Sequence, residues 1–235
     1  MDGELLQEVK REPSISLPVL DLRHLPEAQR DSAAVSIATE DARRPLDLTQ
    51  VPLFRAKLVR LADRQYRLYL VLSHIIFDGV AIYRVFLPEL TALYQSRVAG
   101  HPAPLPDLEI QYPDYSCWQR KSLRPDSLTE HISYWRRQLG TDLPVLNLPT
   151  DHPRPPVQTF RGSMHPFTLS SSLTDAVRSL SREEGVTLFQ TLLAGFAALL
   201  FRYSGQNDLP IGSVTAGRGR PEIESLLGYF LKRCV

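Results

Sequence analysis

The stretch VLSHIIFDG, residues 71–79, joins an apolar run to a helical pattern. The run RLYLVLSHI at 67–75 is almost wholly apolar toward its end, which predicts a central strand buried on both faces. Residues 80–99 then place apolar side chains at helical spacing. We therefore expect a strand that ends at His74 and a helix that opens at Asp78.

A hairpin is expected to contain this strand. FRAKLVRL at 54–61 alternates apolar and charged residues, and the short turn at 63–65 leads from it into 67–75. Further upstream, SISLPVL at 16–22 is typical of a short strand, and the composition of 26–44 favours a helix.

A proline-rich segment, LPVLNLPTDHPRPPVQTFRG at 143–162, cannot form regular structure and marks a domain boundary. We predict an N-terminal lobe at 1–162 and the first part of a second lobe at 163–235. Pro88 should kink or break the helix at 80–99. The other expected elements are helices at 112–124, 128–139 (with Ser127 as N-cap), 172–184, 187–203 and 221–227, and strands at 165–169, 209–215 and 229–235.

The composition is that of an ordinary globular protein. Of 235 residues, 43% are hydrophobic and 23% are charged. The net charge of +1, without a basic run, gives no reason to expect binding to nucleic acid or an anionic membrane. The most apolar stretch, 188–201, is too short to span a bilayer. Cys117 and Cys234 make no disulfide framework, which favours a cytoplasmic location.

His74 carries the most promising chemistry. A histidine at the end of a strand can point into a cleft while its backbone is held rigidly. Imidazole exchanges protons near neutral pH and can take one from an amine or a hydroxyl. Asp78 has two interpretations, as the N-cap of the following helix or as the partner of an arginine that fixes the turn. Gly79 would allow a tight bend. On spacing alone, a packed core histidine with a capping aspartate is the more frequent explanation.

Four segments, in order, resemble the condensation domains of nonribosomal peptide synthetases. Residues 71–79 resemble the motif His-His-x-x-x-Asp-Gly, and QYPDYSCWQR at 111–120 resembles Tyr-x-Asp-Tyr-x-x-Trp. YWRRQL at 134–139 with LPTDHPRP at 148–155 resembles the following connector, and 185–230 resembles the opening of the second lobe. The resemblance implies an α/β (α+β), chloramphenicol acetyltransferase-like sandwich of two lobes with the active site in a tunnel between them. It further implies that this chain is incomplete at both ends, lacking the first two motifs and the end of the second lobe.

The resemblance assigns roles to the residues of the first motif. His74 matches the functional histidine, Asp78 the structural aspartate and Gly79 the motif glycine. Ser73 stands where the family has its first histidine, beside the substrate tunnel.

Other positions follow from the later segments. Arg218 is our expected partner for Asp78, with Arg220 second; for both arginines a solvated loop cation remains the alternative. Lys232 and Arg233 replace the Asn-Thr pair of the family's Gly-x-Phe-Val-Asn-Thr, which puts acceptor-side contacts in doubt. In the second motif, Asp114, Tyr115 and Trp118 are expected to be structural, because aromatic residues three apart pack one helix face.

The resemblance implies formation of a peptide bond between an acyl or peptidyl thioester and the amine of an aminoacyl thioester. Both would be carried on the 4'-phosphopantetheine arms of carrier domains, with an adenylation domain in the same assembly line and no metal or bound cofactor. An epimerising, cyclising or ester-forming relative and a non-catalytic docking fragment remain alternatives.

Overall fold

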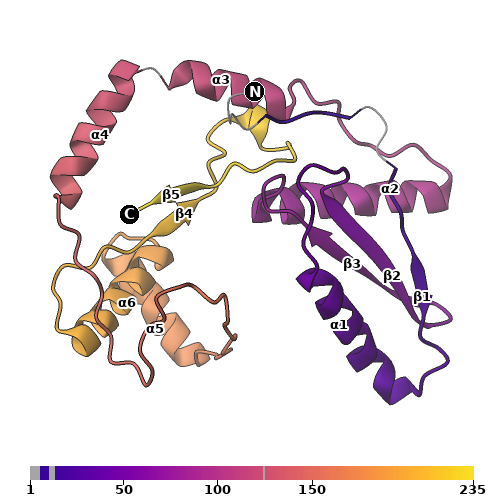
Figure 1. The fold of residues 1–235 in the computed structure, drawn as a ribbon, viewed down its shortest axis with the longest axis horizontal. Coiled ribbons are helices and arrows are strands. Elements are labelled where there is room, and N and C mark those ends of the chain that lie inside the picture. Colours follow the sequence, from indigo (N-terminus) through magenta and orange to yellow (C-terminus); the bar gives the residue numbers. More distant parts are fainter. Residues whose placement is uncertain (1–5, 11–13, 124) are drawn as a thin grey trace. The chain divides into compact units, whose positions relative to one another are not determined.

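The computed structural model describes residues 6–10, 14–123 and 125–235 and contains both helices and strands (Figure 1). The chain divides into two compact units. Unit 1 combines residues 1–127 with 214–234, and unit 2 contains residues 128–213 together with Val235. The boundary at residue 162 between two lobes stays a prediction.

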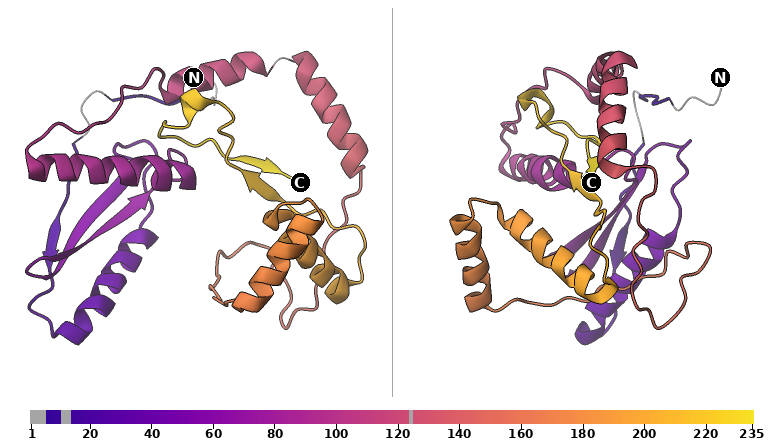
Figure 2. Two further views of the ribbon diagram at one scale, coloured as in Figure 1. Left: turned by 180° about the vertical axis from the view of Figure 1, so that it is seen from behind. Right: turned by 90° about the vertical axis from the view of Figure 1, so that its left-hand side faces the viewer.

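Unit 1 is built around a three-stranded sheet of β1 (Val19–Asp21), β2 (Phe54–Ala62) and β3 (Gln65–Leu72), in the order β1-β2-β3. β1 lies parallel to β2, and β2 and β3 form the predicted antiparallel hairpin. Helix α1 (Glu27–Arg43) packs along the sheet, as Figure 2 also shows. The first core consists of buried Leu22, Ala34, Val59 and Leu61, so α1 covers one face of the sheet.

The prediction that β3 is a central strand buried on both faces was wrong. Among the described residues β3 pairs only with β2, and most of its side chains remain partly exposed. An apolar strand at a sheet edge with a helix on one face keeps its other face accessible. Such a strand cannot be distinguished from a central one by its apolar content alone.

The helix predicted at 80–99 is continuous but changes type before Pro88. A π-helical segment, η1 (Ala81–Phe86), leads into α2 (Leu87–Ala99), and the Leu87 N–H donates to the Ile82 carbonyl. Pro88 therefore falls in the first turn of α2, where its missing N–H is tolerated. This placement explains why the predicted break becomes a local change of helical pitch.

A second core of unit 1 joins segments far apart in sequence. α3 (Tyr112–Ser122) contributes Tyr115, which packs with Ile223, Leu226 and Phe230. The downstream segment consists of β4 (Ser213–Thr215), a single 3-10 turn η2 (Pro221–Ile223) and β5 (Lys232–Cys234), with β4 paired to β5. These elements are shorter than predicted, because most of the segment packs through side chains and carries few ladder hydrogen bonds.

Unit 2 is helical. It holds most of α4 (Pro125–Leu139), together with α5 (Ser171–Glu183) and α6 (Leu188–Ser204). α4 begins at Pro125, so Ser127 lies inside the helix and is not its N-cap. The strand predicted at 165–169 is absent from the described residues. α6 matches the helix predicted at 187–203, and it begins with a capping box between Thr187 and Gln190.

In the described part of the chain, no single helix has the length and apolar character needed to cross a membrane; α5 and α6 pass that test only as a pair, bent by 108°.

Candidate functional site

His74 lies in a turn beyond the end of β3 and not at the end of the strand. β3 stops at Leu72, and the backbone N–H of Ser73 donates to the Leu53 carbonyl over 3.0 Å. The Ile76 N–H then donates to the Ser73 carbonyl over 3.1 Å, which closes the turn. The imidazole is exposed. The expected strand-end placement is thus shifted by two residues, while the rigid backbone anchor expected for His74 is present.

Asp78 performs both of the functions that its sequence position allowed. Its side chain is fully buried, and its Oδ1 accepts a hydrogen bond from the Ala81 N–H at 2.7 Å, as an N-cap does. Its Oδ2 accepts from the Phe230 N–H at 2.9 Å, and its own N–H donates to the Gly228 carbonyl at 3.1 Å. One carboxylate therefore ties the helix after His74 to a segment about 150 residues downstream in sequence.

Arg218 supplies the countercharge to Asp78. Its Nη2 lies 3.3 Å from Oδ1 and 3.4 Å from Oδ2 of the carboxylate. Its Nη1 donates to the carbonyls of Ile223 and Leu226 at 2.6 and 2.9 Å, and its guanidinium stacks 4.1 Å from the centre of the Phe230 ring. The side chain is only 4% exposed, so Arg218 is not a solvated loop cation.

Arg220, our second choice of partner, contacts a different group. Its guanidinium carbon lies 4.4 Å from the centre of the Trp118 ring. Trp118 and Tyr115 in turn have ring centroids 5.8 Å apart on α3, which fits the structural role expected for these aromatic residues. Asp114 accepts a hydrogen bond from the Gln111 N–H and belongs to the capping box of α3.

Tyr112 is a site residue that the sequence interpretation missed, although it is the first tyrosine of the second motif. Its hydroxyl donates to the Tyr229 carbonyl over 2.9 Å, and its ring packs edge-on against Phe230 at 5.2 Å. Burial raises the pKa of this phenol, with smaller contributions from Tyr115, Asp78 and Tyr229. The proton therefore stays on Tyr112, and the phenol acts as a fixed donor.

Tyr229 brings an aromatic ring to His74. The centroids of the two rings are 5.4 Å apart and their planes meet at 73°. Tyr229 occupies the variable position of Gly-x-Phe, so no motif could have pointed to it. The site in unit 1 therefore consists of an exposed imidazole, one aromatic neighbour and a buried layer of hydrogen bonds beneath them.

Gly79 does not make the tight bend that we expected. It is exposed, its backbone is outside the left-handed region, and a Cβ at this position would meet no atom within 4 Å. Nothing in the described structure therefore requires glycine here.

Gly217, beside Arg218, is the glycine that the site requires. Its φ is +67°, and a Cβ would lie 1.9 Å from the Phe230 carbonyl oxygen. We expect Gly217→Ala to destabilise unit 1 by at least about 2 kcal/mol, because it adds left-handed strain to a backbone clash. Gly219→Ala is the matched control, since its Cβ would meet open space at an ordinary φ. Urea unfolding of both variants measures the difference, and equal midpoints would contradict the expectation.

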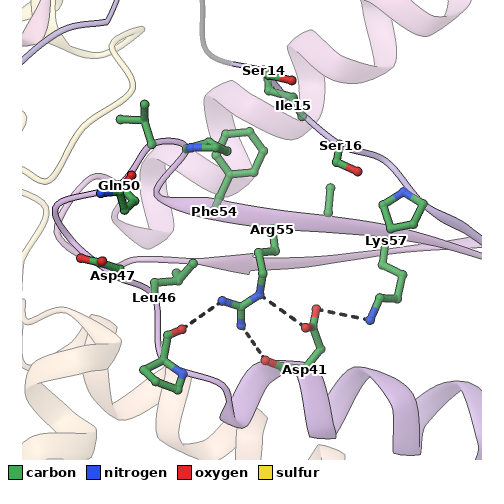
Figure 3. A pocket seen from close by; sticks show the side chains of 15 residues that line it. Ser14, Ile15, Ser16, Asp41, Leu46, Asp47, Gln50, Phe54, Arg55 and Lys57 are labelled. Atoms are coloured by element: carbon green, nitrogen blue, oxygen red, sulfur yellow. Dashed lines mark hydrogen bonds and ion pairs between the residues drawn. The ribbon is translucent and has the colours of Figure 1, made fainter.

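Two hollows of unit 1 are lined by residues other than His74. One, of about 620 Å³, is lined by residues that include Val80, Arg84 and Arg218. The other, of about 470 Å³, lies between the start of β2 and the end of α1 (Figure 3). In it, Asp41 lies 3.4 Å from Arg55 and 3.6 Å from Lys57. One carboxylate thus faces two cations, and Arg55 also donates to the backbone carbonyls of Asp41, Arg44 and Pro45.

The sequence comparisons agree with the motifs. The sequence profile of the family described as "Condensation domain" matches residues 1–233. The chain is 46% identical to a linear gramicidin synthase polypeptide of Brevibacillus parabrevis, over 98% of this chain and 3% of that protein. It is 42% identical to phosphinothricin tripeptide synthetase PhsC of Streptomyces viridochromogenes, over 97% of this chain and 21% of that protein.

Solved structures share the fold. A four-domain nonribosomal peptide synthetase bound to AMP and glycine superposes with a TM-score of 0.77 at 26% identity, over 95% of this chain and 16% of that one. The X-domain from teicoplanin biosynthesis gives 0.82 at 24% identity, over 97% of this chain and 50% of that one, which is evidence for the fold alone. The predicted α/β, chloramphenicol acetyltransferase-like fold is confirmed. The chain spans a small part of these synthetases and half of that solved domain, and it belongs to the condensation-domain family of nonribosomal peptide synthetases.

Proposed function

We propose that this chain forms part of a domain that joins two carrier-bound thioesters through an amide bond, with His74 at the reacting atoms. The observation that carries the proposal is the arrangement of the motif. The histidine is exposed, and the aspartate four residues later is buried and fully engaged in holding the turn in place.

Burial distinguishes the roles of Asp78 and His74 in the motif. Asp78 is fully buried, and both of its carboxylate oxygens accept hydrogen bonds from protein groups, so it cannot touch a substrate. It is a positioning residue. His74, in contrast, has an accessible ring that can reach an amine. Gly79 is exposed, and a Cβ at this position would meet no atom within 4 Å.

The reaction needs little from the protein beyond positioning and one proton acceptor. The amine nitrogen attacks the thioester carbonyl, a C–N bond forms and the C–S bond breaks. His74 orients the amine or takes its proton, and the thiol of the donor arm leaves with a proton. Holding two tethered reactants together supplies much of the rate by itself.

The partners follow from the same proposal. The substrates would be carried on 4'-phosphopantetheine of upstream and downstream carrier domains, with an adenylation domain in the same assembly line, and the reaction would need no metal or bound cofactor. We also assign the protein to the cytoplasm and retain a lobe boundary at residue 162 as parts of this proposal.

The test is a condensation assay with this chain extended at both ends to the length of the matched solved domains. Donor and acceptor carrier proteins are loaded with aminoacyl groups, and the product on the acceptor is identified by mass spectrometry. We expect an amide that requires both carriers. An ester or an epimerised donor would show a different reaction of the same fold. Binding of both carriers without product would show a docking protein.

A further inference from the structure

We propose that Tyr229 is a positioning residue that holds the His74 imidazole in one orientation. The inference rests on the proposed function of His74. The two rings meet almost edge to face, with centroids 5.4 Å apart and an interplanar angle of 73°. Aromatic pairs favour this geometry because the positive edge of one ring meets the negative face of the other.

The imidazole has little else to orient it. Among the residues that the structure describes, none is hydrogen-bonded to the His74 ring, and the ring is exposed. A histidine that exchanges a proton with a substrate needs only one free ring nitrogen, and a hydrogen bond to the other nitrogen often orients the ring. A ring contact fixes the plane of the imidazole and leaves both nitrogens available.

The backbone that carries Tyr229 is fixed at three consecutive residues. The Gly228 carbonyl accepts from the Asp78 N–H at 3.1 Å, and the Phe230 N–H donates to the Asp78 carboxylate at 2.9 Å. Between them, the Tyr229 carbonyl accepts from the Tyr112 hydroxyl at 2.9 Å. The aromatic ring of Tyr229 is thus presented from a rigid backbone.

The same carboxylate fixes both partners of the ring contact. Asp78 caps the helix that follows the His74 turn and also holds Phe230, the neighbour of Tyr229. Asp78 thus restrains the backbone on both sides of the contact. The ring contact with Tyr229 then orients the imidazole side chain.

The first test observes the imidazole directly. In this chain with isotope-labelled histidine, the His74 ring signals are assigned by comparison with His74→Ala and followed by NMR. Tyr229→Leu removes the ring current, so we expect the His74 signals to move while those of the other five histidines stay in place. Tyr229→Phe keeps the ring and should leave His74 unchanged. Unmoved His74 signals in Tyr229→Leu would overturn the contact.

The second test measures its effect on the reaction, in the extended protein of the condensation assay. Tyr229→Leu should lower kcat about tenfold, with the KM for either carrier unchanged, because only the orientation of the imidazole is lost. Tyr229→Phe should match the wild type. In a His74→Ala background, Tyr229→Leu should cause no further loss.

The outcomes separate the two proposals. Full activity of His74→Ala would refute the proposed function, whereas the NMR result on Tyr229 would still decide whether the ring contact exists. If His74→Ala lowers the rate strongly but Tyr229→Leu keeps a normal kcat, the proposed role of His74 is supported and the positioning role of Tyr229 is refuted. A raised KM with normal kcat would likewise refute it, since that result shows a substrate contact.

Discussion

Asp78→Ala is expected to destabilise unit 1 by about 3–5 kcal/mol, the cost of breaking a buried ion pair by removing one partner. The substitution leaves Arg218, whose side chain is 4% exposed, without its countercharge. It also removes the carboxylate oxygens that accept hydrogen bonds from the N–H groups of Ala81 and Phe230. Both of these hydrogen bonds are buried. Each of these losses adds to the cost, because a buried polar group without a partner keeps its desolvation penalty.

Urea unfolding, followed by tryptophan fluorescence, measures this loss. The two tryptophans lie in different units, so a Trp135→Phe background leaves Trp118 to report on unit 1. Asp47→Ala is the matched control, because this exposed carboxylate only accepts from the N–H and hydroxyl of Thr49. The control should cost about 1 kcal/mol or less. Equal losses of unfolding free energy for the two variants would show that Asp78 does not hold the two segments of unit 1 together.

The local elements of the fold were predictable from sequence, because their signals are local. The hairpin of β2 and β3 follows from alternation around a short turn, and α6 follows from the capping residues at Thr187. The prediction of a strand at 165–169 was wrong, because a strand depends on a pairing partner that a local signal does not report. Phe167 is 79% exposed, and no described strand pairs with this segment. A short segment does not form a stable strand without a partner for its backbone hydrogen bonds.

The site residues that belong to a motif were predictable from sequence, whereas contacts that arise only from tertiary packing were not. The first motif placed His74 and Asp78, and the resemblance of 185–230 suggested Arg218 as the partner across 140 residues of sequence. The contact between His74 and Tyr229 spans a similar separation but involves a position at which the motif specifies no residue type. Periodicity and spacing report neighbours within a few residues, so such a contact required the folded structure.

His74→Ala has the largest expected effect on activity. General acid–base groups typically contribute about 10²–10⁴-fold to a rate, and His74 is the accessible proton acceptor of the motif. The residual rate should not reach zero, because two carriers held together still place amine and thioester in contact. The stability of the protein should change little, since the imidazole is exposed and takes no part in the hydrogen bonds of Asp78.

The decisive measurement is the single-turnover rate of amide formation by the extended protein at saturating donor and acceptor carriers, for wild type, His74→Ala and His24→Ala. His24 is an exposed histidine of the same unit whose ring is hydrogen-bonded to the Asp21 carbonyl, so it controls for the loss of an imidazole. We predict a rate at least about 100-fold lower for His74→Ala and an unchanged rate for His24→Ala. Equal rates for His74→Ala and wild type would contradict a role for His74 in the reaction.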